Sequence, residues 1–336
     1  MMQKIESLAR AGLQRLGLDD PVRVGLHWLR HTLHARRVLR APLLPFLREG
    51  EEGPAPGDLR LLAYPDATSA DGKTVLRSGL CSEAQLDSPA FRHWAAALQQ
   101  PWRLHRKLWE FCFICQALYE RGMLESGRRG LCFAVGEEPL PALFASRGCE
   151  IVATDLEAED SRARVWADTA QLATSVEKLS RPGVCDPRIL RERVSFRPVD
   201  MNKIPDNLRD FDFTWSSCSF EHCGSIPLGL DFVANQMKCL RPGGVAVHTT
   251  EFNLTSNDRT LTEGETVIFR KRDIDALVAR LKADGHHVEP VHYSAGSSRA
   301  DRHVDTLPYS EAPHLKLLLA ERFVSTSVAL IIRRAA

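Results

Sequence analysis

Apolar runs alternate with amphipathic stretches over the last two thirds of the chain, and the clearest unit begins at Leu131. The apolar run there predicts a short buried strand, which stops at Gly136. Pro139 then favours the first turn of a helix, where the N–H that proline lacks would have no partner. A second apolar strand ends at Asp155. A strand, a turn, a helix and an acid-ended strand together form half of a nucleotide-binding α/β unit.

The alternation continues to the C-terminus. Further apolar strands are expected at 194–199, 211–215, 245–252, 288–293 and 327–333, with amphipathic helices near 221–240 and 272–285. The residues between 241 and 244, RPGG, are expected to form a turn. Strands that alternate with helices predict a mainly parallel sheet with helices on both faces.

Three segments precede this α/β region. Residues 1–50 predict basic amphipathic helices, which would contact a protein partner or an anionic membrane surface, or else pack on the main domain. Residues 51–80, rich in glycine, proline and acids, predict a linker. Residues 81–125 predict a helical lead-in with an apolar stripe. Its polar side carries three candidates for a lid over the site, or for plain surface: Arg106, Lys107 and Glu110.

The composition narrows the class of protein. The 336 residues suffice for one large domain with an extension. A net charge of +1, from 44 basic and 43 acidic residues, gives no overall field that would recruit nucleic acid or membrane. The sequence shows no apolar run of roughly 20 residues and no signal peptide. Nine cysteines without the spacing of secreted domains favour a reducing compartment, so we expect a cytoplasmic protein.

The first turn also indicates the kind of cofactor. A dinucleotide fingerprint has three glycines, whereas this loop has Gly136 and carries Ala134 nearby. Glu137 and Glu138 place two carboxylates where a pyrophosphate would lie, and like charges repel. A nucleoside with a positive or zwitterionic group is a better ligand, which favours S-adenosylmethionine (SAM) over NAD.

Four motifs in this order resemble those of class I SAM-dependent methyltransferases: VGEEPLP, ATDL, VDMNKIP, and LRPGG before HTTEF. The resemblance covers about 200 residues and extends loosely to the upstream segment HRKLWE. The stretches EHCGSIPLGLDF, HTTEFN and DRHVDTLPY are also similar to methyltransferases of bacterial surface-glycan clusters. The resemblance implies SAM as cofactor and a Rossmann-like, mainly parallel seven-stranded sheet. It places the methyltransferase domain at 81–336, with its core at 126–336.

The cofactor-binding residues that the resemblance implies share one location, the carboxyl ends of the strands. They are Gly136, Glu138, Asp155, Leu156, Asp200, Met201 and Ser216. Gly136 would let the main chain approach the methionine part of SAM, and Asp155 would accept hydrogen bonds from the ribose hydroxyls. Asp200 and the Met201 backbone would bracket the adenine, and Ser216 would line the reactive end.

Methyl transfer to a hydroxyl often requires removal of a proton, which suits histidine because its pKa lies near neutrality. His222 follows the fourth strand and is the first candidate base; a helix-start residue without a catalytic role is the alternative. Glu221 would orient it or accept a substrate hydroxyl. Two further catalytic candidates are Glu251 and His303. The other expected acceptor-binding residues are Asn253, Asp301, Asp305 and Tyr309.

A divalent cation is a possible second cofactor. Asp301, His303 and Asp305 alternate along the chain and, with Glu251, would offer the oxygen-rich ligands that magnesium prefers. A surface loop with satisfied charges is the alternative, and we assign no metal ligand.

We therefore expect a methyltransferase that acts on a hydroxyl of a sugar or glycan. The near-neutral charge and the scarcity of stacking aromatics argue against a nucleic-acid acceptor. Two alternatives stay open: a methyltransferase for a peptide or natural product, and an inactive methyltransferase-fold scaffold that binds a partner.

Overall fold

The computed structural model describes residues 46–48, 61–64, 75–163, 166, 171–310 and 312–336. Apart from 46–48, the expected basic helical segment lies outside these ranges, as does most of the expected linker. The boundaries proposed for these two segments therefore stay predictions. None of the helices within the described ranges is both long and apolar enough to cross a bilayer.

The strands are β1 (Phe46–Arg48), β2 (Leu61–Ala63), β3 (Gly79–Leu80), β4 (Arg129–Cys132), β5 (Glu150–Asp155), β6 (Val194–Pro198), β7 (Phe211–Ser217), β8 (Leu240–Asn253), β9 (His287–Val288), β10 (Leu317–Leu319) and β11 (Phe323–Arg333). The α-helices are α3 (Glu83–Leu86), α4 (Pro89–Ala97), α5 (Arg106–Glu120), α6 (Leu140–Ser146), α8 (Pro187–Arg193), α9 (Ile226–Gln236), α10 (Lys271–Ala283) and α11 (Arg299–Arg302). Short 3₁₀ turns are η1 (Ser161–Ala163), η2 (Val176–Leu179), η3 (Met201–Lys203), η4 (Phe220–His222) and η5 (Met237–Cys239).

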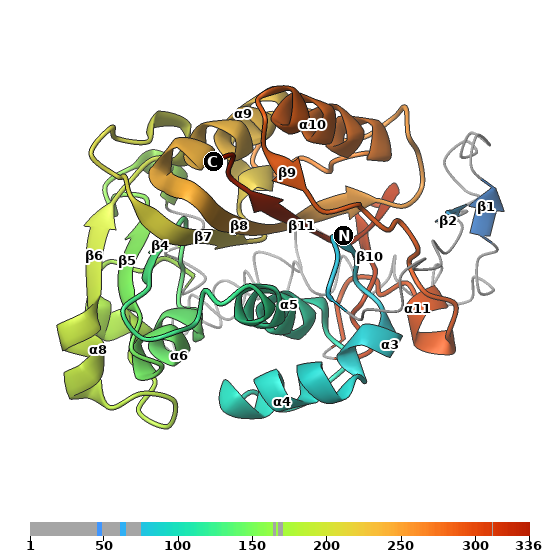
Figure 1. The fold of residues 1–336 in the computed structure, drawn as a ribbon. Helices are drawn as coiled ribbons and strands as arrows, with labels where there is room; N and C mark the ends of the chain where they lie inside the picture. The colour runs from blue at the N-terminus through green and yellow to red at the C-terminus, as the bar shows by residue number, and fades with distance from the viewer. Residues whose placement is uncertain (1–45, 49–60, 65–74, 164–165, 167–170, 311) are drawn as a thin grey trace, which may run out of the picture.

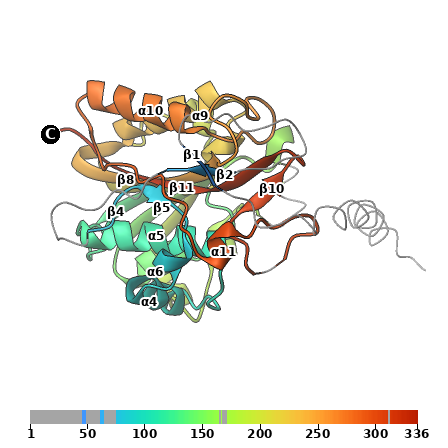
Figure 2. The ribbon, with the colours of Figure 1, turned by 90° about the vertical axis from the view of Figure 1, so that its right-hand side faces the viewer.

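One large sheet organises the chain, in the strand order β10-β11-β8-β7-β4-β5-β6, with β3 and β9 paired to β11 (Figure 1). Strands β4 to β8 run parallel to one another, and β11 is antiparallel to β8. The predicted Rossmann-like fold, with a mainly parallel sheet between layers of helices, is confirmed (Figures 1 and 2). The small pair of β1 and β2 forms a separate sheet.

Each face of the sheet has its own apolar core. Helices α5 and α6 cover one face, with α4 packed on the outer side of α5, and Trp109 and Phe113 of α5 and Trp215 of β7 are fully buried there. Helices α9 and α10 cover the other face, where Phe232 and Leu277 belong to a second cluster. The stripe predicted for 81–125 is thus the buried side of α5.

Two predicted elements differ from the structure. The RPGG segment is part of β8, and the register against β7 shifts between Phe211 and Phe213. Gly243 has a φ of +76°, a conformation that costs glycine little, so the irregularity fits within the strand. The strand expected at 288–293 ends at Val288, shortly before Pro290, which has no N–H to donate to the ladder with β11.

The sheet has a topological switch point between β4 and β7. From β4 the chain proceeds outward to β5 and β6, and it then returns to β7 on the other side of β4. In such sheets the crevice at the carboxyl ends of the strands beside the switch point is where ligands bind.

Candidate active site

A cavity of about 1030 Å³ lies at this switch point. Its walls come from the segments that follow β4, β5, β6 and β7, from the N-terminal part of α5, and from residues 264–266. The volume is at the upper end of the range for small-molecule sites. Seven of the predicted cofactor-binding and catalytic residues line it: Gly136, Glu138, Asp155, Leu156, Asp200, Met201 and His222.

The loop after β4 packs closely against the backbone at Gln171. Ala134 and Gly136 both have positive φ angles, 48° and 52°. A Cβ on Gly136 would lie 2.8 Å from the carbonyl oxygen of Gln171, so a larger residue would displace one of the cavity walls. This close approach is why glycine is needed at position 136.

Asp155 holds that loop in place. Its carboxylate accepts hydrogen bonds from the backbone N–H groups of Gly136, Leu156 and Ala173, at 2.9, 2.9 and 3.2 Å. An ionised carboxylate has about four acceptor positions, so one is left for a ligand hydroxyl. Burial raises the pKa of Asp155 to about 6, although the three backbone bonds act in the opposite direction.

Glu138 supplies a second buried carboxyl group to the cavity wall. It accepts a hydrogen bond from the indole N–H of Trp215 at 2.8 Å, and the Cys132 thiol lies 3.4 Å from the same oxygen. Burial raises the pKa of Glu138 to about 7, against the lowering effect of the Trp215 bond. The site thus has a carboxyl group that ionises near neutral pH.

Asp200 caps the short η3 turn at the next strand end. Its carboxylate accepts from the backbone N–H of Asn202 at 2.9 Å and from Arg162 at 2.9 Å. Asp200, Met201 and Asn202 all line the cavity. Of these three residues, Asp200 and Met201 are the ones predicted to contact the adenine.

Neighbouring serines of β7 face opposite sides of the sheet. Ser216 is fully buried, and its hydroxyl lies 2.8 Å from Nδ1 of His248, away from the cavity. Ser217 lines the cavity instead and donates to Glu110 at 3.1 Å. Of the expected lid residues, Lys107 lines the cavity while Glu110 lies behind it, fully buried.

His222 has the geometry of an oriented base. Its Nδ1 lies 2.7 Å from the backbone carbonyl oxygen of Glu265, which can only accept, so we assign the ring proton to Nδ1. The neutral ring then carries its lone pair on Nε2, which lies 3.8 Å from Glu221. The ring of Trp166 is beside it, with centroids 4.3 Å apart.

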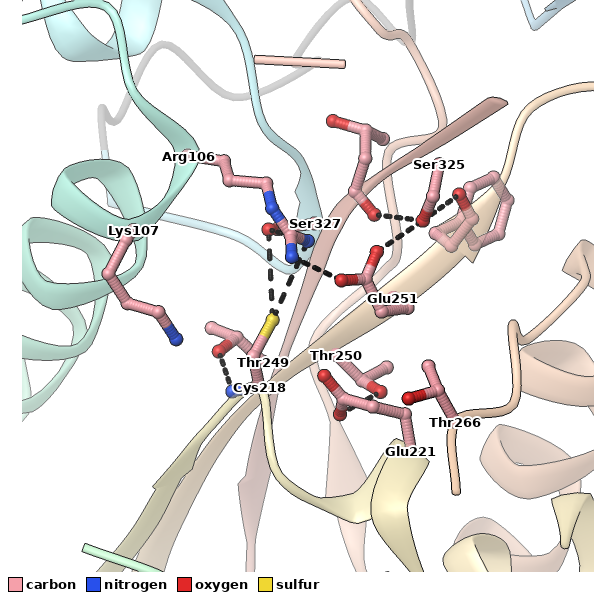
Figure 3. A network of polar contacts seen from close by, with 12 residues as sticks. Arg106, Lys107, Cys218, Glu221, Thr249, Thr250, Glu251, Thr266, Ser325 and Ser327 are labelled. Carbon is pink, nitrogen blue, oxygen red and sulfur yellow. Dashed lines mark hydrogen bonds and ion pairs between the residues drawn. The ribbon is translucent and has the colours of Figure 1, made fainter. Parts of the chain in front are cut away.

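A network of buried charges joins α5 to the sheet behind this wall (Figure 3). Arg106 forms an ion pair with Glu251 of β8, which also accepts from the Ser325 hydroxyl. Glu110 accepts from four donors: Lys107, Ser217, Cys218 and Ser327. Burial alone would raise the pKa of Glu110, but the charges of Lys107 and Arg106 override it and hold that pKa at about 2.

Cys218, Glu221 and Glu251 bring a sulfur and two carboxylate oxygens within 4.8 Å of one another. One observation argues against a metal centre there: the guanidinium of Arg106 already pairs with Glu251 and neutralises its charge. The network of Figure 3 therefore has an internal cation.

The remaining candidates lie away from the cavity. Asn253 accepts from the backbone and hydroxyl of Thr255, and Asp301 accepts from the backbone of Glu83. His303 ends α11. The other two hold a loop together, Asp305 through His314 at 2.6 Å and Tyr309 through the carbonyl of Leu318. The structure therefore does not bring Asp301, His303 and Asp305 together with Glu251 as one group of ligands.

That loop supports α5. His314 stacks on His105, with ring centroids 4.5 Å apart, and His105 is the N-cap of α5. Asp305 therefore affects the cavity wall only indirectly, because it supports the end of α5 that carries Arg106 and Lys107.

The cavity also has lining residues that the sequence did not single out: Trp166, Gln171, Arg181, Cys218, Cys223, Glu265 and Thr266. Trp166 could have been found, because it is the one aromatic residue in the polar sequence between 156 and 193. The others have no comparable signal in the sequence.

No protein-family model matches the chain, and no curated protein matches it. Among solved structures, a SAM-dependent methyltransferase from Methanosarcina mazei is similar at 12% identity, over 65% of this chain and 97% of that one, with a TM-score of 0.41. A second, from Mesorhizobium loti, has 14% identity over 65% and 96%, with a TM-score of 0.39.

Two further structures show the range of chemistry among these neighbours. The 1,6-didemethyltoxoflavin-N1-methyltransferase of Burkholderia thailandensis, with bound S-adenosylhomocysteine, has 16% identity over 76% of this chain and 82% of that one, with a TM-score of 0.38. A [4+2]-cyclase has 17% identity over 66% and 83%, with a TM-score of 0.39. At these identities and scores, the neighbours assign neither a substrate nor a residue role to this chain.

Proposed function

We propose that the cavity binds SAM and that the protein transfers its methyl group to a hydroxyl of a sugar or glycan. The observation that carries the proposal is the cavity itself, at the switch point, with Gly136, Asp155 and Asp200 at three successive strand ends and His222 after the fourth. The order of these groups is the order that the motifs predict.

The chemistry of the wall supports a zwitterionic nucleoside. Gly136 lines the cavity and allows the loop after β4 to pack against Gln171, and Asp155 keeps one acceptor position for a hydroxyl. Glu138 offers a carboxyl group that ionises near neutrality, while Lys107 and Arg181 supply positive charge. Such a mixed wall complements a ligand that carries both a carboxylate and positive groups.

When bound, SAM would supply an electrophilic methyl group on sulfur. The chain's own task is to hold the acceptor, exclude water and take one proton. His222 suits the last task, since its neutral ring has a free lone pair on Nε2 and is fixed through Nδ1. Trp166 beside it also lines the cavity, and an aromatic side chain in the wall is compatible with a sugar ring as acceptor.

Calorimetric titration of the full chain with SAM and with S-adenosylhomocysteine, with and without magnesium, tests the proposal. We expect micromolar binding of both ligands. Absence of binding to either would reject the enzyme and favour the scaffold alternative.

Turnover with glycan precursors, followed by S-adenosylhomocysteine release, then tests the role of His222. Removal of a general base typically costs about 10²–10⁴-fold in rate. His222→Gln should therefore lose at least about 100-fold in kcat while it binds SAM within about threefold of the wild type. A fully active variant would remove His222 as the base.

A further inference from the structure

Glu221 lies behind His222 and is not among the described residues that line the cavity. Its side chain is 1% exposed, and one carboxylate oxygen accepts from the Thr250 hydroxyl at 2.8 Å. The other oxygen lies 3.8 Å from Nε2 of His222. This separation is too long for a hydrogen bond but short enough for a strong charge interaction.

The hydrogen bond to the Glu265 carbonyl determines which ring nitrogen of His222 can take a new proton. The Glu265 carbonyl holds the ring proton on Nδ1, so a second proton can bind only at Nε2. Nε2 is the ring nitrogen that lies 3.8 Å from Glu221. Protonation of His222 would therefore create an imidazolium–carboxylate pair, half of which is fully buried.

The charged and titratable groups around Glu221 come from four elements. Glu251 of β8 lies beside it and, together with burial, raises the pKa of Glu221, whereas the charge of His222 lowers it. Arg106 of α5 is paired with Glu251, and the Cys218 thiol after β7 stays neutral because burial raises its pKa. Glu265, in the loop after β8, is exposed. Because Arg106 is paired with Glu251, the group that can balance the charge of Glu221 is the protonated ring of His222.

We infer that Glu221 and His222 form one acid–base pair, in which the buried carboxylate stabilises the proton that the ring takes from the acceptor. The inference rests on the proposed function, because methyl transfer to a hydroxyl supplies that proton. In the transfer, the acceptor oxygen bonds to the methyl carbon as the carbon–sulfur bond breaks and its electron pair goes to sulfur. The hydroxyl proton moves to Nε2. Glu221 does not contact the acceptor and is a positioning residue.

Histidine-detected NMR titration of the full chain tests the pair without any turnover. The His222 ring signals are assigned by their loss in His222→Gln. Glu221→Gln keeps the shape of the side chain and an acceptor for Thr250 but removes the charge. An opposite charge at this distance typically moves a titration midpoint by about 1–3 pH units. We therefore expect the midpoint of the His222 ring to fall by at least about one pH unit in Glu221→Gln.

Glu265→Gln is the matched control, since it removes an exposed carboxylate next to His222 and keeps the backbone carbonyl that holds the ring. Its effect should be less than about half a pH unit, because water screens an exposed charge. Equal midpoints for the wild type and Glu221→Gln, or equal shifts in the two variants, would overturn the inference. If Glu221→Gln does not fold, the wild-type titration decides: a ring midpoint at or below the usual value near 6.5 rejects the pair, because a neighbouring carboxylate would raise it.

The pH dependence of kcat then links the pair to catalysis. In Glu221→Gln the acid limb should move to lower pH, because the ring loses the charge that favours its protonated form, and the plateau should fall as a weaker base works more slowly. Glu221→Asp, which restores the charge, should return the acid limb toward its wild-type position. An acid limb unmoved in Glu221→Gln would exclude Glu221 from the reaction. Failure of SAM to bind the wild type would instead reject the proposed function, and the NMR result for the pair would stand by itself.

Discussion

A single carboxyl group in this site can stabilise the fold and also take part in the proposed binding of SAM. Asp155 accepts three backbone N–H groups that belong to the two loops on either side of it, Gly136 on one and Ala173 on the other. A ligand hydroxyl can use the acceptor position that is left. Binding and local folding are therefore expected to depend on the same side chain.

Replacement of Asp155 by alanine should affect both properties. The affinity for SAM, measured by calorimetry, should fall at least about tenfold, because a charge-assisted hydrogen bond is lost and the loop is loosened. The free energy of unfolding should fall by about 2–3 kcal/mol, since buried N–H groups lose their acceptor. Glu157→Ala, two residues further on and exposed, is the control and should change neither quantity. Wild-type affinity in Asp155→Ala would contradict the assigned site.

Glu138 should make the affinity for SAM depend on pH. Its pKa is about 7, so the carboxyl group is mostly neutral at pH 6 and mostly ionised at pH 8. If the ionised form binds the cationic part of SAM, affinity should rise about tenfold over this interval. Asp155, with a pKa of about 6, ionises in the same interval, so the comparison with Glu138→Gln isolates the contribution of Glu138. Calorimetry at pH 6, 7 and 8 should give a clearly shallower slope in the variant; equal slopes would count against Glu138.

At the scale of elements, α5 is the wall that depends most on buried charge. Its N-terminal turn carries Lys107 and, one turn on, Phe111, which both line the cavity. The Arg106–Glu251 pair fixes this turn to β8, and both side chains are largely shielded from water, 14% and 6% exposed. Breaking this ion pair would leave an unpaired charge in a largely buried environment. The position of this part of the wall therefore depends on the pair.

Arg106→Met should therefore destabilise the protein by about 3–5 kcal/mol, because it leaves the Glu251 carboxylate buried and unpaired. Arg92→Met on α4, which breaks an exposed pair with Asp87, should cost less than about 1 kcal/mol. The double variant with Glu251→Gln should recover at least half of the loss, since no unpaired charge is left. Urea denaturation measures the free energy of unfolding of each variant. If Arg106→Met destabilised the protein no more than Arg92→Met does, the Arg106–Glu251 pair would be excluded as the contact that fixes α5 to β8.

The ends of elements could be predicted from the sequence, but the directions of side chains could not. Gly136, Asp155 and Asp200 mark places where apolar runs stop, and parallel strands bring such places to one edge of the sheet. From the sequence, Ser216 and Ser217 are equally good candidates at the end of one strand. Successive residues of a strand point to opposite faces, however, so Ser217 lines the cavity while Ser216 is buried in the core.

Residues in loops were harder still to place from the sequence. Asn253 and Asp305 follow predicted strands or sit in polar motifs, but each turns back to bond its own loop, to Thr255 and to His314. Asparagine and aspartate bond nearby backbone and side-chain groups readily, and the sequence alone does not tell this use from binding. Lys107 and Cys218 come together only through the packing of α5 on the sheet.

At the scale of the whole molecule, the two-sided sheet buries ionisable groups in opposite protonation states. Burial lowers the pKa of His248, in the core beneath α9, to about 3, so the folded protein keeps the ring neutral. Burial raises the pKa of Asp155 and Glu138, which the folded protein keeps protonated to higher pH than the unfolded chain does. Between about pH 4 and 7 these effects on stability oppose one another. The pH dependence of the stability of the wild type therefore does not reveal the contribution of any one group. Variants are needed to separate the contributions.

His248→Gln should remove one of these opposing effects. The folded-state pKa of His248 lies below the usual value near 6.5, so its contribution to stability is complete above pH 6.5 and is lost as the pH falls toward 3. Between pH 7 and pH 5 the wild type should lose about 2 kcal/mol relative to the variant. Urea denaturation at both pH values gives the free energy of unfolding of each protein. The change between pH 7 and pH 5 is then compared between the wild type and the variant.

Phe232→Leu is the matched control for His248→Gln, because its ring lies 5.6 Å from the His248 ring and carries no titratable group. This change should lower the free energy of unfolding at every pH by about 1 kcal/mol, through lost packing, and leave the profile parallel to that of the wild type. A parallel profile for His248→Gln as well would mean that His248 stays accessible to protons in the folded state. The core beneath α9 would then open to water well below the free energy of global unfolding.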